Sequence, residues 1–294
     1  MTYAKNNSTD WRGLLMSQVW LITGASRGLG RAIADAALAA GHSVVATTRS
    51  GMLDNTDPQF SDRLLVLPLD VTTPGERAYS SLVESVMERY GRIDVLVNNA
   101  GRGMLIHFEE TDEAQVRELF ETNVFGLMRV TRAVLPIMRQ QRSGHIFNIS
   151  SAAGYVGGAG MYSATKFAVT GFTESLAFEL HPFGIKATNV APGYFRTDFL
   201  DVSSVQAGPA QELDDYQPSR TGMRSFAEQA NHQQVGDPAA LGRLLVEVAA
   251  AEHPPLHLAV GGDCIEEIEQ HQRTLMSDID TWRERAVATA HQTA

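Results

Sequence analysis

VWLITGASRGLG, residues 19–30, is the stretch of sequence that decides the fold. A short apolar run typical of a buried strand leads into a glycine turn spaced G-x-x-x-G-x-G, and an alanine-rich helical pattern then runs to about Ala40. The glycines alone also fit an ordinary strand-to-helix turn. In a strand–turn–helix unit, however, they indicate a nucleotide fold whose backbone N–H groups receive a pyrophosphate. The residues expected at that site are Gly24, Ser26, Arg27, Gly28, Leu29 and Gly30.

Six further strand-like runs follow along the chain, and helical patterns separate most of them. The runs are 43–48, 64–69, 93–97, 145–151, 185–190 and 256–260. The helical pattern over 111–140 fits either one bent helix or two helices. With 44% apolar residues, the 294-residue chain can bury a sizeable core.

Composition excludes several classes of protein. The net charge of −10 argues against a nucleic-acid partner. The single Cys264 excludes an intramolecular disulfide and a cysteine-based metal site, and the nine histidines form no pair at metal-ligand spacing, so no metal is expected. No apolar run reaches membrane-spanning length, so we expect no membrane partner and a soluble, cytoplasmic protein. Residues 1–17 have no signal-peptide core and are expected to form a flexible N-terminal extension, with Met16 as an alternative start.

Two arginines bear on the choice of nucleotide. An NAD-binding fold normally places an acidic residue at the end of its second strand, but Arg49 stands there and the next acidic residue is Asp54. Arg27 lies inside the glycine turn, so the two guanidinium groups can converge on a 2′-phosphate. The sequence therefore favours NADP(H) over NAD(H). The alternative is a pair of solvated surface arginines.

Polar residues follow the third and fourth strands. Asp70-Val71 come after the third, where Asp70 either caps its own turn or receives the adenine amino group. Asn98-Asn99-Ala100-Gly101 end the fourth, where the asparagines either tie strand ends together or line a cofactor cleft. The cofactor-binding candidates here are Asp70, Val71, Asn99, Ala100 and Gly101.

A catalytic group is expected after the fifth strand. Ser151 ends that strand, and Tyr162 and Lys166 share one face of the next helix. An ammonium and a cationic nicotinamide ring both favour a phenolate, so Tyr162 can act as general acid in reduction and general base in oxidation. Ser151 can donate a hydrogen bond to the substrate oxygen. Asn123, in an otherwise apolar stretch, either kinks its helix or holds a water in a proton path, and the residue alone favours the first.

These motifs together closely resemble the short-chain dehydrogenase/reductase family, in its single-domain branch, over about residues 18–200. They are Thr23-Gly24-x3-Gly28-x-Gly30, Asn98-Asn99-Ala100-Gly101, Asn123, Ser151, Tyr162-x3-Lys166 and Pro192-Gly193. The resemblance implies a doubly wound Rossmann fold of the α/β class, with a seven-stranded parallel sheet and helices on both faces, here over residues 18–261.

The resemblance also implies roles for single residues. Tyr162 would exchange the proton, Ser151 rather than Ser150 would orient the carbonyl, and Lys166 would lower the tyrosine pKa and bind the nicotinamide ribose. Asn123 would hold a water that links Lys166 to solvent. The cofactor would also meet Tyr162, Asn99, Asp70, Pro192, Gly193 and Thr197.

Two segments lie beyond the shared motifs. The resemblance implies that residues 194–230 form a mobile substrate lid. The apolar residues of this segment favour an apolar or medium-sized carbonyl substrate. Packing of the same residues against the body of the protein explains them equally well. Residues 262–294 are predicted to form an amphipathic helical extension with Ile265, Ile268 and Leu275 on its apolar face. It could pack on its own body, which we prefer, or on a partner subunit. A homo-oligomer (dimer or tetramer) and a monomer both stay open.

The resulting hypothesis is an NADP(H)-dependent carbonyl reductase or alcohol dehydrogenase acting on a ketone or secondary alcohol. A non-catalytic nucleotide-sensing regulator is one alternative, although such proteins commonly lack the tyrosine or the lysine. An epimerase or dehydratase using the same tyrosine is the other.

Overall fold

The first strand, β1 (Val19–Ile22), is buried on both faces, as a central parallel strand must be. Trp20 and Ile22 pack with one apolar cluster, whereas Val19 and Leu21 pack with another on the opposite face. The computed structural model describes residues 17–291, so the extension predicted over 1–17 lies outside the described residues except for Ser17.

Seven parallel strands form the sheet, in the order β3-β2-β1-β4-β6-β7-β9. Their bounds are β1 Val19–Ile22, β2 Ser43–Thr48, β3 Leu64–Pro68, β4 Val95–Asn98, β6 Gly144–Ile149, β7 Ile185–Pro192 and β9 His257–Val260. The chain adds strands outward from β1 to β3 and then crosses to the other side of β1. The carboxyl ends of β1 and β4 therefore flank the point where such folds bind ligands.

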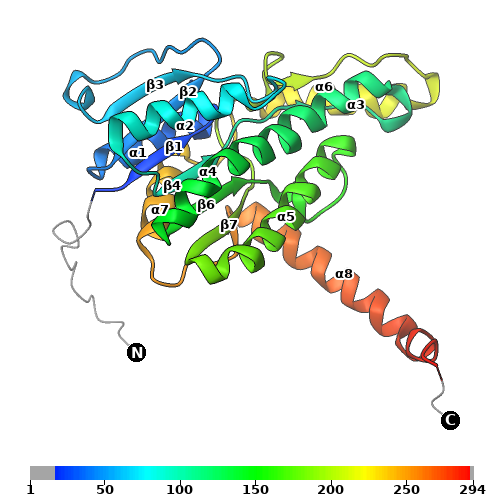
Figure 1. The fold of residues 1–294 in the computed structure, drawn as a ribbon. Helices are drawn as coiled ribbons and strands as arrows, with labels where there is room; N and C mark the ends of the chain where they lie inside the picture. The colour runs from blue at the N-terminus through cyan, green and yellow to red at the C-terminus, as the bar shows by residue number, and fades with distance from the viewer. Residues whose placement is uncertain (1–16, 292–294) are drawn as a thin grey trace, which may run out of the picture.

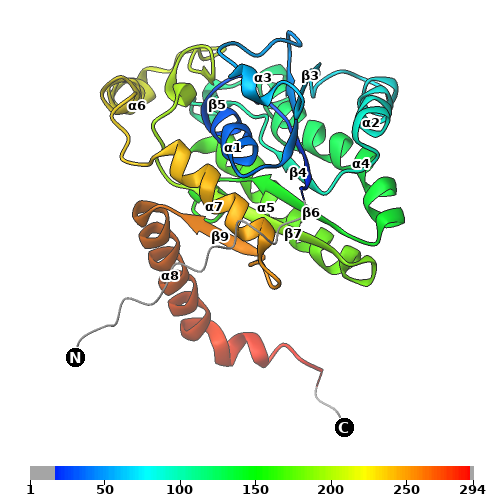
Figure 2. The ribbon, with the colours of Figure 1, turned by 90° about the vertical axis from the view of Figure 1, so that its left-hand side faces the viewer.

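Helices cover both faces of this sheet (Figures 1 and 2). The larger helices are α1 Gly28–Ala39, α2 Arg77–Tyr90, α3 Glu113–Phe120, α4 Leu127–Gln141, α5 Gly160–Leu180, α6 Gln217–Ala230, α7 Pro238–Ala250 and α8 Gly262–Val287. Residues of α1 and α7 belong to one apolar cluster, and residues of α2, α4 and α5 to the other. The predicted doubly wound fold is confirmed. Among residues 17–291, no helix has both the length and the apolar character to cross a bilayer.

The long helical pattern over 111–140 forms one continuous run with an irregular turn inside it. A π-helical turn, η4 (Glu121–Gly126), joins α3 directly to α4 and contains Asn123. Such turns occur frequently at functional sites. The structure therefore has one interrupted helix here and not two separate helices.

The segment 194–230, predicted as a lid, is more ordered than its sequence pattern indicates. It contains the 14-residue helix α6 and a short strand, β8 (Val205–Gln206), which pairs with β5 (Gly103–Met104). Sequence periodicity missed α6 because the buried side chain of this helix is an arginine, Arg220, and not an apolar residue.

Arg220 anchors this segment to the body. Its guanidinium forms an ion pair with Glu110, which is fully buried and also accepts a hydrogen bond from the Leu213 N–H at 2.9 Å. Burial by itself raises the pKa of Glu110, but the Leu213 N–H and the Arg220 guanidinium outweigh burial and hold that pKa below its usual value. Beside this pair, the rings of His107 and Tyr216 stack at 4.6 Å.

The C-terminal helix corrects one expectation. We expected the apolar face of α8 to pack on its own body, but the helix extends away from the sheet in both views (Figures 1 and 2). Cys264, in its first turn, is its buried residue, whereas Leu275, Ile279 and Trp282 are exposed. The own-body prediction is therefore wrong beyond the first two turns.

Replacing Arg220 by alanine should loosen α6, because it leaves the Glu110 carboxylate buried without its cation. We expect amide hydrogen exchange in residues 217–230 to accelerate by roughly tenfold or more, measured by mass spectrometry. The control is Arg224→Ala, since Arg224 is half-exposed and lies 3.9 Å from Glu212. Equal exchange in the two variants would contradict the anchoring role of Arg220.

Candidate active site

The glycine turn is closed against the end of β4. Gly24 has a φ of +65°, and a Cβ there would lie 2.9 Å from the Ala100 Cα. A Cβ on Gly30 would lie 2.3 Å from the Asn99 side-chain nitrogen. Gly28, with a φ of +59°, begins α1. A side chain is therefore disfavoured at each of these glycines, which leaves backbone N–H groups and a helix N-terminus to receive a pyrophosphate.

Asn99 holds the two strand ends together. Its Nδ2 donates hydrogen bonds to the carbonyl oxygens of Thr23 at 2.9 Å and Gly24 at 3.0 Å. The backbone N–H groups of Asn99 and Ala100 both donate to the Thr23 hydroxyl. Of the two roles expected for this asparagine, the hydrogen bonding between strand ends is present. Contact with a cofactor stays a prediction.

Ser151, Tyr162 and Lys166 lie at the carboxyl edge of the same sheet. The Lys166 Nζ is 5.6 Å from the centre of the Tyr162 ring and donates a hydrogen bond to the Ile149 carbonyl at 2.8 Å. Ser151 is the second residue after β6, and its Oγ accepts a hydrogen bond from the Ala153 N–H at 3.2 Å. The Ser151 hydroxyl also forms a hydrogen bond with the Tyr162 phenol.

Ser150, the rival serine, points into the protein instead. Its hydroxyl donates to the Lys166 carbonyl at 3.1 Å and lies 3.2 Å from the Thr170 hydroxyl. It is buried and fixes the end of β6 to α5. The structure thus separates a serine used in packing from a serine at the site edge.

Burial dominates the electrostatics of the tyrosine and the lysine. It lowers the pKa of Lys166 to about 8. It raises the pKa of Tyr162 above the ordinary phenol value, while a hydrogen bond with Ser151 acts in the opposite direction. The sequence predicted a phenol made acidic by the ammonium and a cationic ring together. The protein's own groups do not produce that acidity, so the bound ring would have to supply much of it.

Asn123 sits in the π-helical turn with all of its side-chain contacts inside the protein. Its Oδ1 accepts from the Arg102 N–H at 2.9 Å, and its Nδ2 donates to the Arg102 carbonyl at 2.9 Å and to the Thr165 hydroxyl at 3.1 Å. Both features of the bending interpretation, an irregular helix and a backbone partner, are present. The water-holding role stays a prediction.

The residues after β7 reach back over the glycine turn. A Cβ on Gly28 would lie 3.5 Å from the Thr197 Cβ, which brings these two predicted cofactor residues together. Pro192 ends β7, and Gly193 lies against the carboxylate of Asp263, which accepts a hydrogen bond from the Tyr194 N–H at 2.7 Å. Sequence reasoning missed Asp263. An acidic residue in the first turn of a helix was the available signal.

The two arginines have separate partners. Arg27 donates hydrogen bonds to the hydroxyls of Ser203 at 2.9 Å and Ser204 at 2.7 Å. Arg49 is exposed beside Asp70. Hydrogen bonds from the Thr72 backbone and hydroxyl lower the pKa of Asp70, and the Arg49 charge adds to that effect. Asp70 therefore caps its own turn, while its contact with adenine and the convergence of the two arginines on a 2′-phosphate stay predictions.

Aromatic side chains from the segment 194–230 approach the tyrosine. The rings of Phe199 and Tyr162 are 5.7 Å apart, and Tyr194 meets Phe226 of α6 edge-on at 5.8 Å. The Phe199 ring also lies 3.3 Å from where a Gly103 Cβ would be. Phe199 thus gives the phenol an apolar neighbour, and the pair of Tyr194 and Phe226 adds aromatic surface to the same segment.

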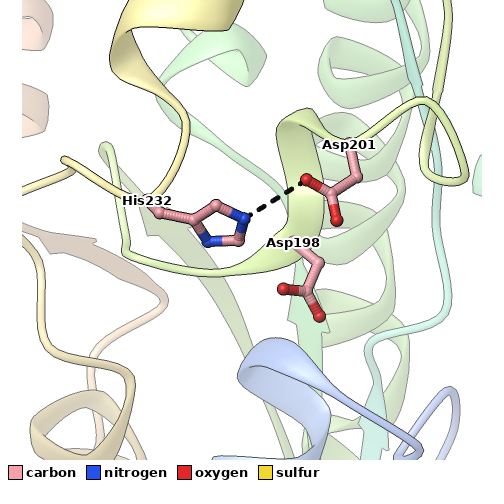
Figure 3. A group of neighbouring side chains, drawn as sticks. All are labelled: Asp198, Asp201 and His232. Atoms are coloured by element: carbon pink, nitrogen blue, oxygen red, sulfur yellow. Dashed lines mark ion pairs between the residues drawn. The ribbon is translucent and has the colours of Figure 1, made fainter.

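One cluster in the described chain has the composition of a metal site. Asp198, Asp201 and His232 place potential ligand atoms within 4.8 Å of one another (Figure 3). The His232 Nε2 is 3.4 Å from the Asp201 Oδ1, which also accepts a hydrogen bond from Asn231 at 2.5 Å. The sequence expectation of no metal rested on spacing along the chain and could not detect this grouping. The ion pair and the hydrogen bond of Asp201 explain this grouping without a metal, because they link the loop at Asp201 to the two residues that follow α6.

Comparisons with known proteins agree with this architecture. The family model for short chain dehydrogenases matches residues 18–232. An oxidoreductase, BOA17, from Botryotinia fuckeliana is 39% identical over 282 residues, covering 94% of this chain and all of the relative. A 3-ketodihydrosphingosine reductase from Bacteroides thetaiotaomicron is 37% identical over 250 residues, covering 84% of this chain and 89% of the relative.

A solved structure extends the likeness to three dimensions. A short-chain dehydrogenase from Streptomyces avermitilis superposes with a TM-score of 0.84 at 40% identity, covering 93% of this chain and 98% of that one. The chain therefore belongs to the short-chain dehydrogenase family of oxidoreductases. The resemblance predicted from the motifs is confirmed.

Proposed function

We propose that this protein is an NADP(H)-dependent carbonyl reductase or alcohol dehydrogenase. The observation that carries the proposal is the pair of partly buried Tyr162 and buried Lys166, with Ser151, at the same sheet edge as the closed glycine turn. A proton donor, a cation and a hydroxyl beside a nucleotide site are the groups that carbonyl reduction needs.

Each protein group has a distinct part in this reaction. When bound, the nicotinamide cofactor supplies or accepts the hydride. Tyr162 gives its phenol proton to the carbonyl oxygen in reduction and takes it back in oxidation. Ser151 donates its hydroxyl hydrogen to the same oxygen, because its Oγ is already held by the Ala153 N–H. Lys166 stays in place through its bond to the Ile149 carbonyl and stabilises negative charge on the phenol.

The cofactor would lie along the residues predicted from the motifs. The glycine turn would hold the pyrophosphate, and Arg49 together with Arg27 would hold the 2′-phosphate. Arg27 would exchange its bonds to two serine hydroxyls for a phosphate, a stronger acceptor. No carboxylate follows β2 before Asp54, which removes the usual partner of the NAD ribose. Both features favour NADP(H).

The substrate is proposed to be an apolar carbonyl compound or alcohol. Support comes from Phe199 beside the phenol and from the aromatic surface that Tyr194 and Phe226 add to the same segment. The relative named a 3-ketodihydrosphingosine reductase is a ketone reductase by that name, which agrees with this class.

Replacing Tyr162 by phenylalanine should lower kcat by roughly a thousandfold or more, because the oxygen loses its proton donor. NADPH binding, measured by fluorescence, should stay within about threefold, since the substitution removes one hydroxyl from a preformed cleft. The control is Tyr155→Phe, a change at a neighbouring loop that should keep most of the turnover. Retained turnover in the Tyr162 variant would overturn the proposed mechanism.

Arg49→Ala should weaken the preference for NADPH. We expect the ratio of kcat/KM for NADPH to that for NADH to fall by roughly tenfold or more, through a higher KM for NADPH, since a charge-assisted phosphate contact is lost. The measurement is nucleotide oxidation with a panel of ketones. Arg243→Ala, at an exposed position on α7, is the control. Wild-type rates with NADH that equal or exceed those with NADPH would refute the assignment of the arginines.

A further inference from the structure

Among residues 17–291, most of α8 has no packing partner within its own chain. The first two turns are attached to the body, where Cys264 is buried and Ile268 packs beside Tyr155. Beyond them, Leu275 is 45% exposed, Ile279 42% and Trp282 57%. A helix of 26 residues is about 39 Å long, so much of its apolar face lies in water.

Four of the six large exposed apolar residues of α8 follow a seven-residue repeat, namely Ile265, Leu275, Ile279 and Trp282, whereas Met276 and Val287 lie beside it. Counting Ile279 as position a and Trp282 as position d, the repeat places Leu275 at d, Gln272 at a and Ala286 at a. We call these five residues the α8 seam. Ile265 and Ile268 continue the same phase into the body. An a/d stripe is narrower than the face with which a helix covers a globular core, and it is the pattern of a helix that pairs with another helix.

Two polar features of the seam select the partner and its direction. Gln272 is the one polar residue of the seam, and in a parallel, in-register pair it meets its own copy, whereas an antiparallel pair would set it against an apolar residue. Asp278 at position g faces Arg283 at position e of the other helix in the parallel arrangement, and this contact occurs twice by symmetry. Within a single chain the exposed Arg283 forms an ion pair with the exposed Asp280 at 2.5 Å, a surface contact that it would exchange for the one with Asp278 of the second helix.

We propose that α8 pairs through its seam with α8 of a second copy of this chain, as a short parallel coiled coil. The identical partner satisfies both polar features at once. An anionic membrane surface does not, because Glu266, Glu267 and Glu269 stand at the base of the helix and the chain carries a net charge of −10.

The first experiment measures the mass of the full-length protein by light scattering after gel filtration. The double variant Ile279→Asp/Trp282→Asp should halve the mass of the wild type, because it places charges in the seam. Ser277→Asp, on the outer side of α8, is the control and should keep the wild-type mass. Both variants should keep the wild-type melting temperature of the body, because these positions are exposed. A monomeric wild type, or a double variant of unchanged mass, would overturn the proposal.

The second experiment tests direction by crosslinking. Gln272→Cys should form a disulfide between two chains under mild oxidation, since position a meets its copy in a parallel pair, whereas Ser277→Cys should not. The native Cys264 does not interfere, because it is buried, its Sγ lies 3.1 Å from the Ala191 carbonyl, and burial raises its pKa to about 11. Equal crosslinking in both variants, or none in the first, would contradict the parallel pair.

Discussion

The buried ammonium of Lys166 is the constraint on which the site depends. Taking a charge out of water is costly, and here one backbone carbonyl, that of Ile149, is its hydrogen-bond partner among the described residues. The cost appears directly as a pKa lowered to about 8. The Lys166 ammonium therefore needs rigid surroundings to stay in this buried position, and these are formed by β6, α5 and the buried hydroxyl of Ser150. A charge held in this way gains most when a negative phenolate forms beside it.

The rest of the fold brings other groups to this charge. Asn99 binds the ends of β1 and β4 together, so the glycine turn is fixed relative to the end of β4. The segment 194–230 is attached at both ends, by Arg27 to the glycine turn and by Arg220 to a buried carboxylate. Asp263 joins the root of α8 to the backbone of Tyr194. Pairing of α8 would therefore act close to the segment 194–230.

Local sequence patterns predicted the strands and the glycine turn, because residue types close together in the chain determine these elements. Each buried strand appears as an apolar run, and the glycine turn fixed the first unit, because parallel strands and close backbone approach restrict residue types strongly. Helix α6 escaped detection because an arginine fills its buried position. Glu110, Asp263 and the group around Asp201 were missed because their partners are distant in sequence. Periodicity showed the apolar face of α8 but not what covers it.

The acidity of Tyr162 is the property that the sequence and the structure describe differently. The motif predicts a phenol that ionises easily, whereas burial in the protein itself raises its pKa. The two agree if the positive ring of the oxidised nucleotide, bound next to Lys166, provides the missing stabilisation of the phenolate.

The most direct test is a pH titration of the phenolate absorbance, taken as the difference between the wild type and Tyr162→Phe. Without nucleotide we expect ionisation of Tyr162 only above pH of about 10. With saturating NADP⁺ the midpoint should fall by more than about one pH unit, and the rate of alcohol oxidation should rise with pH through the same midpoint. A midpoint that nucleotide leaves unchanged would contradict the proposed role of the buried pair.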